Sequence, residues 1–188
     1  MEAPEPIGDR GGVRVAAVIA VALAGAFVIW LLFKGDGNDA NKAAAPKRAP
    51  ASAVSLSDLR DLQRSVGHPV YWAGPKSGYN YELSRTADGN IYLRYLPSGI
   101  EPGVAAADYL SVSTYPNDDA FGTVEQASKR ENERVDQISG GGLAVSNPDL
   151  PGSVYVARPG SKYLIEVYDP SPARARKIAT SGQVVPIN

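Results

Sequence analysis

The sequence predicts an α+β domain with a mainly antiparallel sheet and about three helices, preceded by one transmembrane helix. Residues 15–33 form a run with no charged or polar side chain. In residues 54–188, short stretches with strand-like alternation outnumber the helical patterns. The clearest links between these stretches, at 88–89 and 159–160, are turn dipeptides that suit hairpins. Because hairpins join antiparallel strands, the folded part should belong to the α+β class.

The apolar run at residues 15–33 is long enough to cross a bilayer. As a helix it would cover about 28 Å, close to the hydrocarbon thickness of about 30 Å. Arg14 and Lys34 flank the run, and Trp30 lies near its end, where an indole ring suits the headgroup region. The alternatives are a buried core helix and a cleaved signal peptide. Cleavage at the small residues inside the run would leave a strongly apolar new N-terminus, so we expect an uncleaved signal anchor.

The segments on either side of this anchor have different compositions. Residues 1–14 are rich in Pro and Gly and should be a short disordered cytoplasmic tail. Residues 34–53 are an Ala/Pro/Lys-rich linker, which would act as a semi-flexible spacer. Basic residues occur on both sides of the anchor, so the positive-inside rule alone does not fix the orientation. A short tail before a long domain favours a cytoplasmic N-terminus and a domain outside the cell membrane.

Residues 54–188 should form a single extracytoplasmic α+β domain. In its first half, a helix is expected to begin at the cap residue Ser57 and to stop at Gly67. The dipeptide at 88–89, Asp-Gly, predicts a hairpin. The strands expected in this half are 70–73, 79–85, 91–96 and 109–115.

The second half begins with a helix that Asn117 or Asp118 would cap and that should run to about Glu131. A later helix should begin at Ser171, because Pro172 suits its first position. The Pro-Gly dipeptide at 159–160 predicts a turn between two strands. The strands expected in this half are 134–138, 143–146, 154–158, 162–168 and 183–187.

Two segments of the domain resemble each other. Residues 70–83 and 154–167 align without a gap and share Val, Tyr, Ala, Pro, Ser, Tyr and Glu. Either the domain contains a duplicated half with equivalent hairpins, or two unrelated hairpins use the same turn chemistry. Glu82 and Glu166 occupy equivalent positions, and strand alternation predicts that both side chains point to solvent.

The composition excludes several kinds of site. The chain has no cysteine and a single histidine, His68, so cysteine-based metal sites, thiol nucleophiles, disulfides and histidine-rich metal sites are impossible. No metal, cofactor or catalytic residue is therefore predicted. With 19 basic and 20 acidic residues, the chain also lacks the basic excess typical of nucleic-acid binding, and no nucleic-acid partner is expected. Arg174, Arg176 and Lys177 form a cationic group, for which there are two interpretations: it binds an anionic headgroup or polymer, or it only complements the dipole at a helix C-terminus.

The aromatic residues are the best candidates for binding. All ten tyrosines lie between Tyr71 and Tyr168. They could line a groove for a glycan, a peptide or a partner strand, although most should be core residues of strands. The residues predicted to face a ligand are His68, Tyr71, Trp72 and Tyr155.

These features predict a non-catalytic binding or interaction module that is tethered to the membrane and faces the cell envelope. Its partners would be the lipid bilayer, through residues 15–33, and an envelope polymer or a protein. In general style, the anchor and linker resemble those of envelope proteins from bacteria with Ala-rich proteomes. The alternatives are a carboxylate-dependent envelope hydrolase and a structural subunit of a membrane complex.

Overall fold

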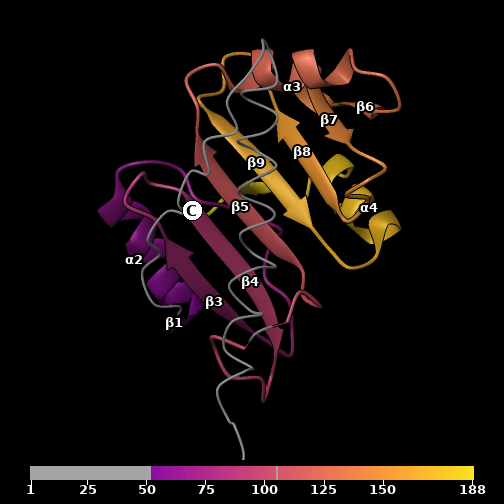
Figure 1. Cartoon of the computed structure of the whole chain (residues 1–188). Coiled ribbons are helices and arrows are strands. Elements are labelled where there is room, and N and C mark those ends of the chain that lie inside the picture. The colour runs from indigo at the N-terminus through magenta and orange to yellow at the C-terminus, as the bar shows by residue number, and fades with distance from the viewer. Residues whose placement is uncertain (1–51, 105) are drawn as a thin grey trace, which may run out of the picture.

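The computed structural model describes residues 52–104 and 106–188 (Figure 1). The predicted tail 1–14, the predicted transmembrane helix 15–33 and nearly all of the predicted linker 34–53 lie outside the described residues. Within the described residues, no helix is both long and apolar enough to cross a bilayer. The last two linker residues belong to a strand, so the folded part begins at Ser52.

An eight-stranded antiparallel sheet forms the frame of the domain, with the order β1-β3-β4-β5-β9-β8-β7-β6. A separate two-stranded sheet pairs β2 with β10. The described residues contain three α-helices, which confirms the predicted α+β class for this part of the chain. The strands are β1 (Ser52–Val54), β2 (Tyr71–Trp72), β3 (Tyr79–Arg85), β4 (Ile91–Pro97), β5 (Ser111–Pro116), β6 (Arg134–Ile138), β7 (Gly142–Ser146), β8 (Ser153–Ala157), β9 (Tyr163–Tyr168) and β10 (Val185–Pro186).

The large sheet consists of two meanders that meet at its centre. One contains β3, β4 and β5, and the other contains β6, β7, β8 and β9. The antiparallel pairing of β5 with β9 joins them, in a register that runs from Ser111 opposite Tyr168 to Pro116 opposite Tyr163. The helix α3 (Ala120–Ser128) lies in the connection that carries the chain from the centre of the sheet to its edge at β6.

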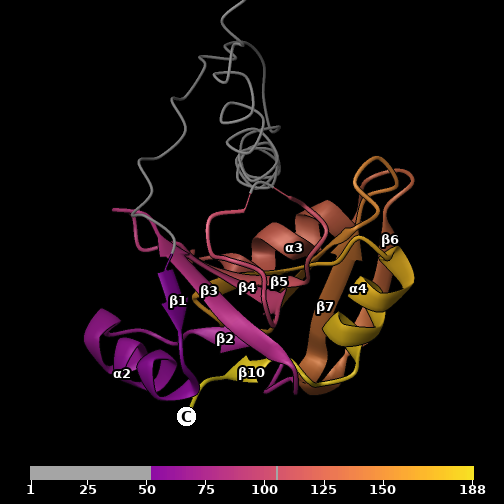
Figure 2. The same ribbon diagram turned by 90° about the horizontal axis from the view of Figure 1, so that it is seen from below.

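Both faces of the sheet are covered. Figure 2 shows α2 (Leu56–Val66), α4 (Pro172–Thr180) and the small sheet on one face, with α3 on the other. The larger hydrophobic core lies between the sheet and the face covered by α2, α4 and the small sheet. The smaller core lies on the opposite face, where α3 packs against Val145, Tyr155 and Leu164. All five residues of β8 are therefore buried. Central strands of this kind lose the alternation of buried and solvated residues that a half-exposed sheet would show.

The helix starts differ from the predicted ones. Ser55, not Ser57, caps α2: its hydroxyl accepts a hydrogen bond from the Asp58 amide at 3.2 Å, and the Asp58 carboxylate accepts one from the Ser55 amide at 2.8 Å. This reciprocal capping box fixes the first turn. Asp119, not Asn117 or Asp118, caps α3 by accepting from the Gly122 amide at 3.1 Å.

The end of α2 agrees with the sequence. Gly67 takes the left-handed conformation with φ of +70°, which a glycine adopts at little cost. It terminates the helix and turns the chain toward β2.

The two similar segments do not form equivalent hairpins. Residues 154–167 contain the β8–β9 hairpin, as predicted. In residues 70–83, however, β2 pairs with β10, while β3 pairs with β1 and β4. Because β1 occupies the free side of β3, β2 cannot lie there. The prediction of two matching hairpins, on which both interpretations depended, is wrong.

Candidate functional site

Three half-buried rings lie together, one from the loop between α2 and β2, one from β2 and one from β9. The ring of His68 stacks on that of Tyr163, with 5.6 Å between centroids and 27° between planes. Tyr71 lies 6.5 Å from Tyr163, with its ring tilted by 48°. We call His68, Tyr71 and Tyr163 the aromatic surface. Each ring retains partial exposure, so the aromatic surface presents apolar area to solvent.

The backbone fixes the position of each ring. His68 follows the helix-ending Gly67, and its Nδ1 lies 3.0 Å from the carbonyl oxygen of Pro69. A carbonyl only accepts, so this hydrogen bond places a proton on Nδ1. The Tyr71 amide donates to Oγ1 of Thr114 on β5 at 3.1 Å, which ties β2 to the large sheet. Tyr163 opens β9, and its amide donates to Oγ of Ser161 at 3.1 Å.

A cationic residue adjoins the aromatic surface along the hairpin: Arg158 directly follows β8, and Tyr163 opens β9 after the turn at 159–160. Burial raises the pKa of the Tyr71 hydroxyl, and the positive charge of Arg158 acts in the opposite direction. On the other side, Gly89 brings the β3–β4 turn near His68: a Cβ at Gly89 would lie 3.7 Å from Nε2 of His68.

The structure brings together two of the four residues predicted to face a ligand. His68 and Tyr71 belong to the aromatic surface. Trp72 is only 8% exposed and faces the larger core, where its ring lies 6.1 Å from that of Tyr81. Tyr155 is 2% exposed and lies beneath α3. For these two the prediction is wrong, because alternation along β2 turns Trp72 inward and α3 covers the face that carries Tyr155.

Two residues of this site were not predicted from the sequence. Tyr163 and Arg158 flank the Pro-Gly turn at 159–160. Residues at the two ends of a tight hairpin turn lie side by side, so this turn was the available signal. The proximity of Tyr163 to Tyr71 depends on the packing of β2 over β5 and was not visible in the sequence.

Glu166 lies in the interior and not in solvent. It is 1% exposed and accepts hydrogen bonds from the hydroxyls of Tyr115 at 2.6 Å, Ser153 at 2.8 Å and Tyr155 at 3.2 Å. The prediction of a solvated Glu166 is wrong, because α3 and the neighbouring strands cover its face. Burial raises the pKa of Glu166, and the three hydroxyl donors offset part of that rise.

Glu82 is also buried, at 5% exposure, and the prediction of solvation is wrong for it too. Its carboxylate lies 3.3 Å from Nε of Arg94 and accepts a hydrogen bond from the Gly103 amide at 2.6 Å. Arg94 in turn donates to the carbonyl of Val104 at 3.1 and 3.2 Å. This ion pair fastens the segment after β4 to the sheet. Glu82 and Glu166 thus have structural partners, and neither faces an open cleft.

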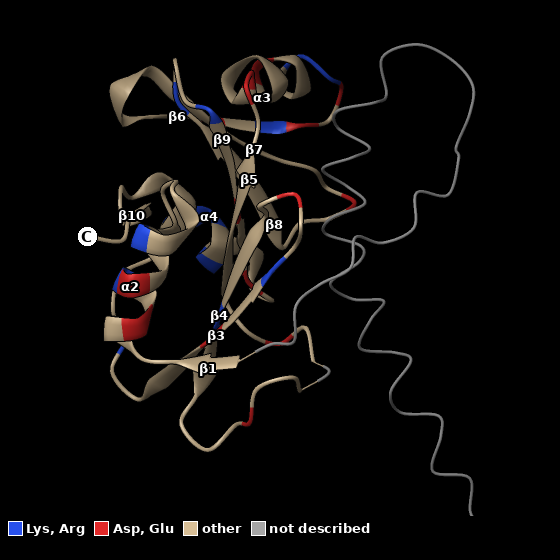
Figure 3. Ribbon diagram, turned by 90° about the vertical axis from the view of Figure 1, so that its left-hand side faces the viewer, with Lys and Arg blue, Asp and Glu red and all other residues tan. Residues whose placement is uncertain are grey.

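Two of the three predicted cations on α4 are paired within the domain. Arg174 donates to Asp169 at 2.6 Å, and Arg176 forms a two-pronged contact with Asp136. Asp169 also accepts a hydrogen bond from the Ser171 amide at 2.8 Å. The helix α2 is also not uniformly charged, because Figure 3 shows acidic as well as basic residues on it. Only Lys177 of the three cations has no ion-pair partner among the described residues.

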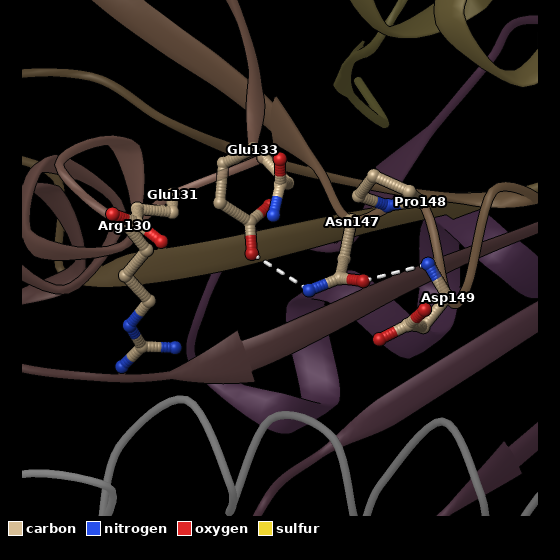
Figure 4. Close-up of a pocket in the computed structure, with 7 residues that line it drawn as sticks. Arg130, Glu131, Glu133, Asn147, Pro148 and Asp149 are labelled. Atoms are coloured by element: carbon tan, nitrogen blue, oxygen red, sulfur yellow. Dashed lines mark hydrogen bonds between the residues drawn. The ribbon is translucent and has the colours of Figure 1, made fainter.

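A polar pocket opens where the segment after α3 meets the β7–β8 turn (Figure 4). Within it, Asn147 donates to Glu133 at 2.8 Å and accepts from the Asp149 amide at 2.7 Å. The pocket has no aromatic wall, and the described residues contain no group of three or more acidic or histidine side chains suited to a metal ion. The residues that line it are Arg130, Glu131, Asn132, Glu133, Asn147, Pro148 and Asp149.

Comparison with known proteins provides no relative: no family model, no curated protein and no solved structure matches the chain. The function must therefore be argued from the chemistry of the residues themselves.

Replacing Glu166 by glutamine should flatten the pH dependence of stability. Because the folded-state pKa lies above the unfolded value, the stability that Glu166 contributes is full below about pH 4.5 and is lost as the pH rises through the folded pKa. Glu166→Gln should remove this loss, since a neutral amide does not titrate. Urea unfolding of residues 52–188 between about pH 4 and pH 8 measures the effect.

Glu131→Gln is the matched control, because Glu131 is exposed. Its unfolding free energy should follow the pH as the wild type does. Equal slopes for Glu166→Gln and the wild type would contradict the raised pKa.

Proposed function

We propose that the chain is a non-catalytic, membrane-tethered module that binds an envelope component through the aromatic surface. The three half-buried rings of His68, Tyr71 and Tyr163 carry this proposal. Tyrosine and arginine are enriched among the residues that supply most of the energy at interfaces, where they combine large contact area with a polar group. Arg158, which directly follows β8 across the hairpin turn from Tyr163, supplies the second of these residue types.

The tether in this proposal comes from the sequence. Residues 15–33 have the length and uniform apolarity of a bilayer span, and residues 34–51 separate them from β1. A linker of that length reaches at most about 60 Å when extended. The domain would therefore meet partners in a layer next to the membrane. In this orientation the N-terminus of the chain lies in the cytoplasm, and the domain with its aromatic surface lies outside.

A carboxylate-dependent envelope hydrolase is the alternative function. Such an enzyme needs two carboxyl groups that face each other across a cleft. Glu82 and Glu166 are held by interior partners, which disfavours them. The polar pocket supplies Glu133 and Asp149, but Asn147 lies between the two and already bonds Glu133. The pocket also offers no ring on which a sugar could stack.

The second alternative, a structural subunit of a membrane complex, would present one large exposed apolar patch. Among the described residues, the large apolar side chains with the highest exposure are Val104, Val135 and Val185, at 37, 41 and 42%. They lie on three different elements: the segment after β4, β6 and β10. Their separation gives this alternative less support than the aromatic surface gives the binding module.

A photo-crosslinking amino acid at Tyr163 should capture the envelope component in living cells. The matched control position is Gln126, which is exposed on α3, on the opposite face of the sheet. We expect a discrete adduct from position 163 and none from position 126, because only the first lies in the proposed interface. Adducts from position 126 alone, or equal adducts from both, would contradict the proposal.

The tether makes a separate prediction. Deleting residues 15–33 should release the chain from the membrane fraction, since no other segment is proposed to span the bilayer. Protease added to intact cells, with the outer barrier permeabilised, should digest the domain, whereas inverted vesicles should protect it. Protection in intact cells with digestion in inverted vesicles would place the domain in the cytoplasm and refute the orientation.

A further inference from the structure

We propose that the outer edge of β6 pairs with the same edge of a second copy of this chain, so that the large sheet continues across a two-fold axis. This surface is separate from the aromatic surface, and the proposal does not depend on the proposed function. It rests on the free edge of β6, on an exposed valine in the strand and on the opposite charges that flank this valine.

The two ends of the eight-stranded sheet differ in length. The strand at one end, β1, has three residues, whereas β6 at the other end has five. On one side β6 pairs with β7, and on its other side lies no strand of the part of the chain that the structure describes (Figure 1). Backbone N–H and C=O groups along such a side are a template for a further strand. Because a very short edge strand discourages pairing, β6 is the end of the sheet better suited to accept one.

The side chains of β6 alternate between the two faces of the sheet. Arg134 and Asp136 share one face, where Asp136 accepts a hydrogen bond from Nε of Arg176 on α4 at 2.5 Å. Val135 belongs to the other face and is 41% exposed, although it is a large apolar residue. Arg134 is also exposed, and it forms no ion pair with a residue that the structure describes. A paired strand would cover the valine and supply the arginine with a partner.

The charges of β6 favour one register for its pairing with a second β6. A two-fold axis perpendicular to the sheet places one residue of the strand opposite its own copy. With Val135 on the axis, the two valines face each other, and Arg134 of each copy lies opposite Asp136 of the other. Opposite charges and apolar residues stabilise a sheet when they lie directly opposite each other. The Asp136 carboxylate can accept from Arg134 of the second copy as well as from Arg176, since it offers about four lone-pair sites.

The neighbouring registers are less favourable. With Arg134 or Asp136 on the axis, two like charges would lie directly opposite each other, which is destabilising. With Gln137 on the axis, Asp136 would lie opposite Ile138, and neither charge of the strand would gain a partner. The register centred on Val135 is therefore the one that we propose.

Disulfide trapping tests this pairing, and the chain has no cysteine of its own that would interfere. Directly opposed residues of antiparallel strands have Cα atoms about 4.5 to 5.5 Å apart, within the range of about 4.4 to 6.8 Å that a disulfide spans. Val135→Cys in the full-length chain, purified in detergent micelles, should therefore form a covalent dimer when copper phenanthroline oxidises two thiols to one disulfide. A non-reducing gel measures the rate. Val185→Cys is the matched control, because Val185 on β10 is 42% exposed, and it should dimerise only at the background rate.

A charge reversal in the Val135→Cys chain tests the register. Arg134→Glu should slow dimer formation about fivefold or more, since it replaces two attractive cross-strand pairs by repulsive ones. Arg134→Lys should keep most of the rate, because the positive charge is retained. Arg85→Glu makes the same change at the exposed end of β3 and should leave the rate unchanged.

Three results would overturn the proposal. The first is an equal rate of dimer formation for Val135→Cys and Val185→Cys. The second is fast dimer formation by Val135→Cys that Arg134→Glu leaves unchanged, because the charges would then not select the register. The third is a mixed disulfide between position 135 and a different protein in oxidised cells, with no covalent dimer of this chain. None of these results bears on the aromatic surface, which the photo-crosslinker at position 163 tests separately.

Discussion

The antiparallel pairing of β5 with β9 joins the two halves of the domain, and its register determines both the interior and the surface described above. Opposite Ser113 on β5 lies Glu166 on β9, and the next residue of β5 on the same face, Tyr115, donates to that carboxylate. At the end of the pair, Pro116 lies opposite Tyr163. A shift by one residue would turn Glu166 to the other face and move Tyr163 away from Tyr71.

Coverage of both faces of the sheet determines what the charged residues can do. A carboxylate placed on a covered strand must find hydrogen-bond donors or a cation, since burial without them costs several kcal/mol. Glu166 has three hydroxyl donors, and Glu82 has Arg94 and the Gly103 amide. Both carboxylates are therefore occupied by partners inside the domain. The three rings of the aromatic surface, by contrast, keep part of their area exposed.

Local patterns in the sequence identified much of this fold. The bounds of β3 agree with the predicted strand. Tyr79, Tyr81 and Leu83 alternate there with more polar residues, and an Asp-Gly turn follows. The hairpin of β8 and β9 and the proline start of α4 also follow from neighbouring residues. The exposure of Glu82, Glu166 and Tyr155 did not follow, since it depends on what packs over each strand. That packing involves residues far apart in the chain.

In the candidate site, too, local sequence patterns predicted some features, whereas packing between distant residues determined the others. His68 and Tyr71 attracted attention as the single histidine and an aromatic neighbour, but Trp72 and Tyr155 shared that signal and are buried. Trp72 faces the larger core and Tyr155 lies beneath α3, and neither contact can be read from neighbouring residues in the sequence. Tyr163 and Arg158 come to the site from the other half of the domain. A surface assembled from both meanders in this way is not visible in any short stretch of sequence.

The central claim is that the aromatic surface is the binding face of a tethered module. Hydrogen–deuterium exchange of the full-length chain tests it most directly, by comparing the protein in native membranes that retain envelope material with the protein purified in detergent. The account predicts slower exchange in membranes for residues 68–71 and 158–163, with no change in α3 (Ala120–Ser128) on the opposite face. Protection confined to α3, or equal exchange in both states throughout the domain, would contradict it.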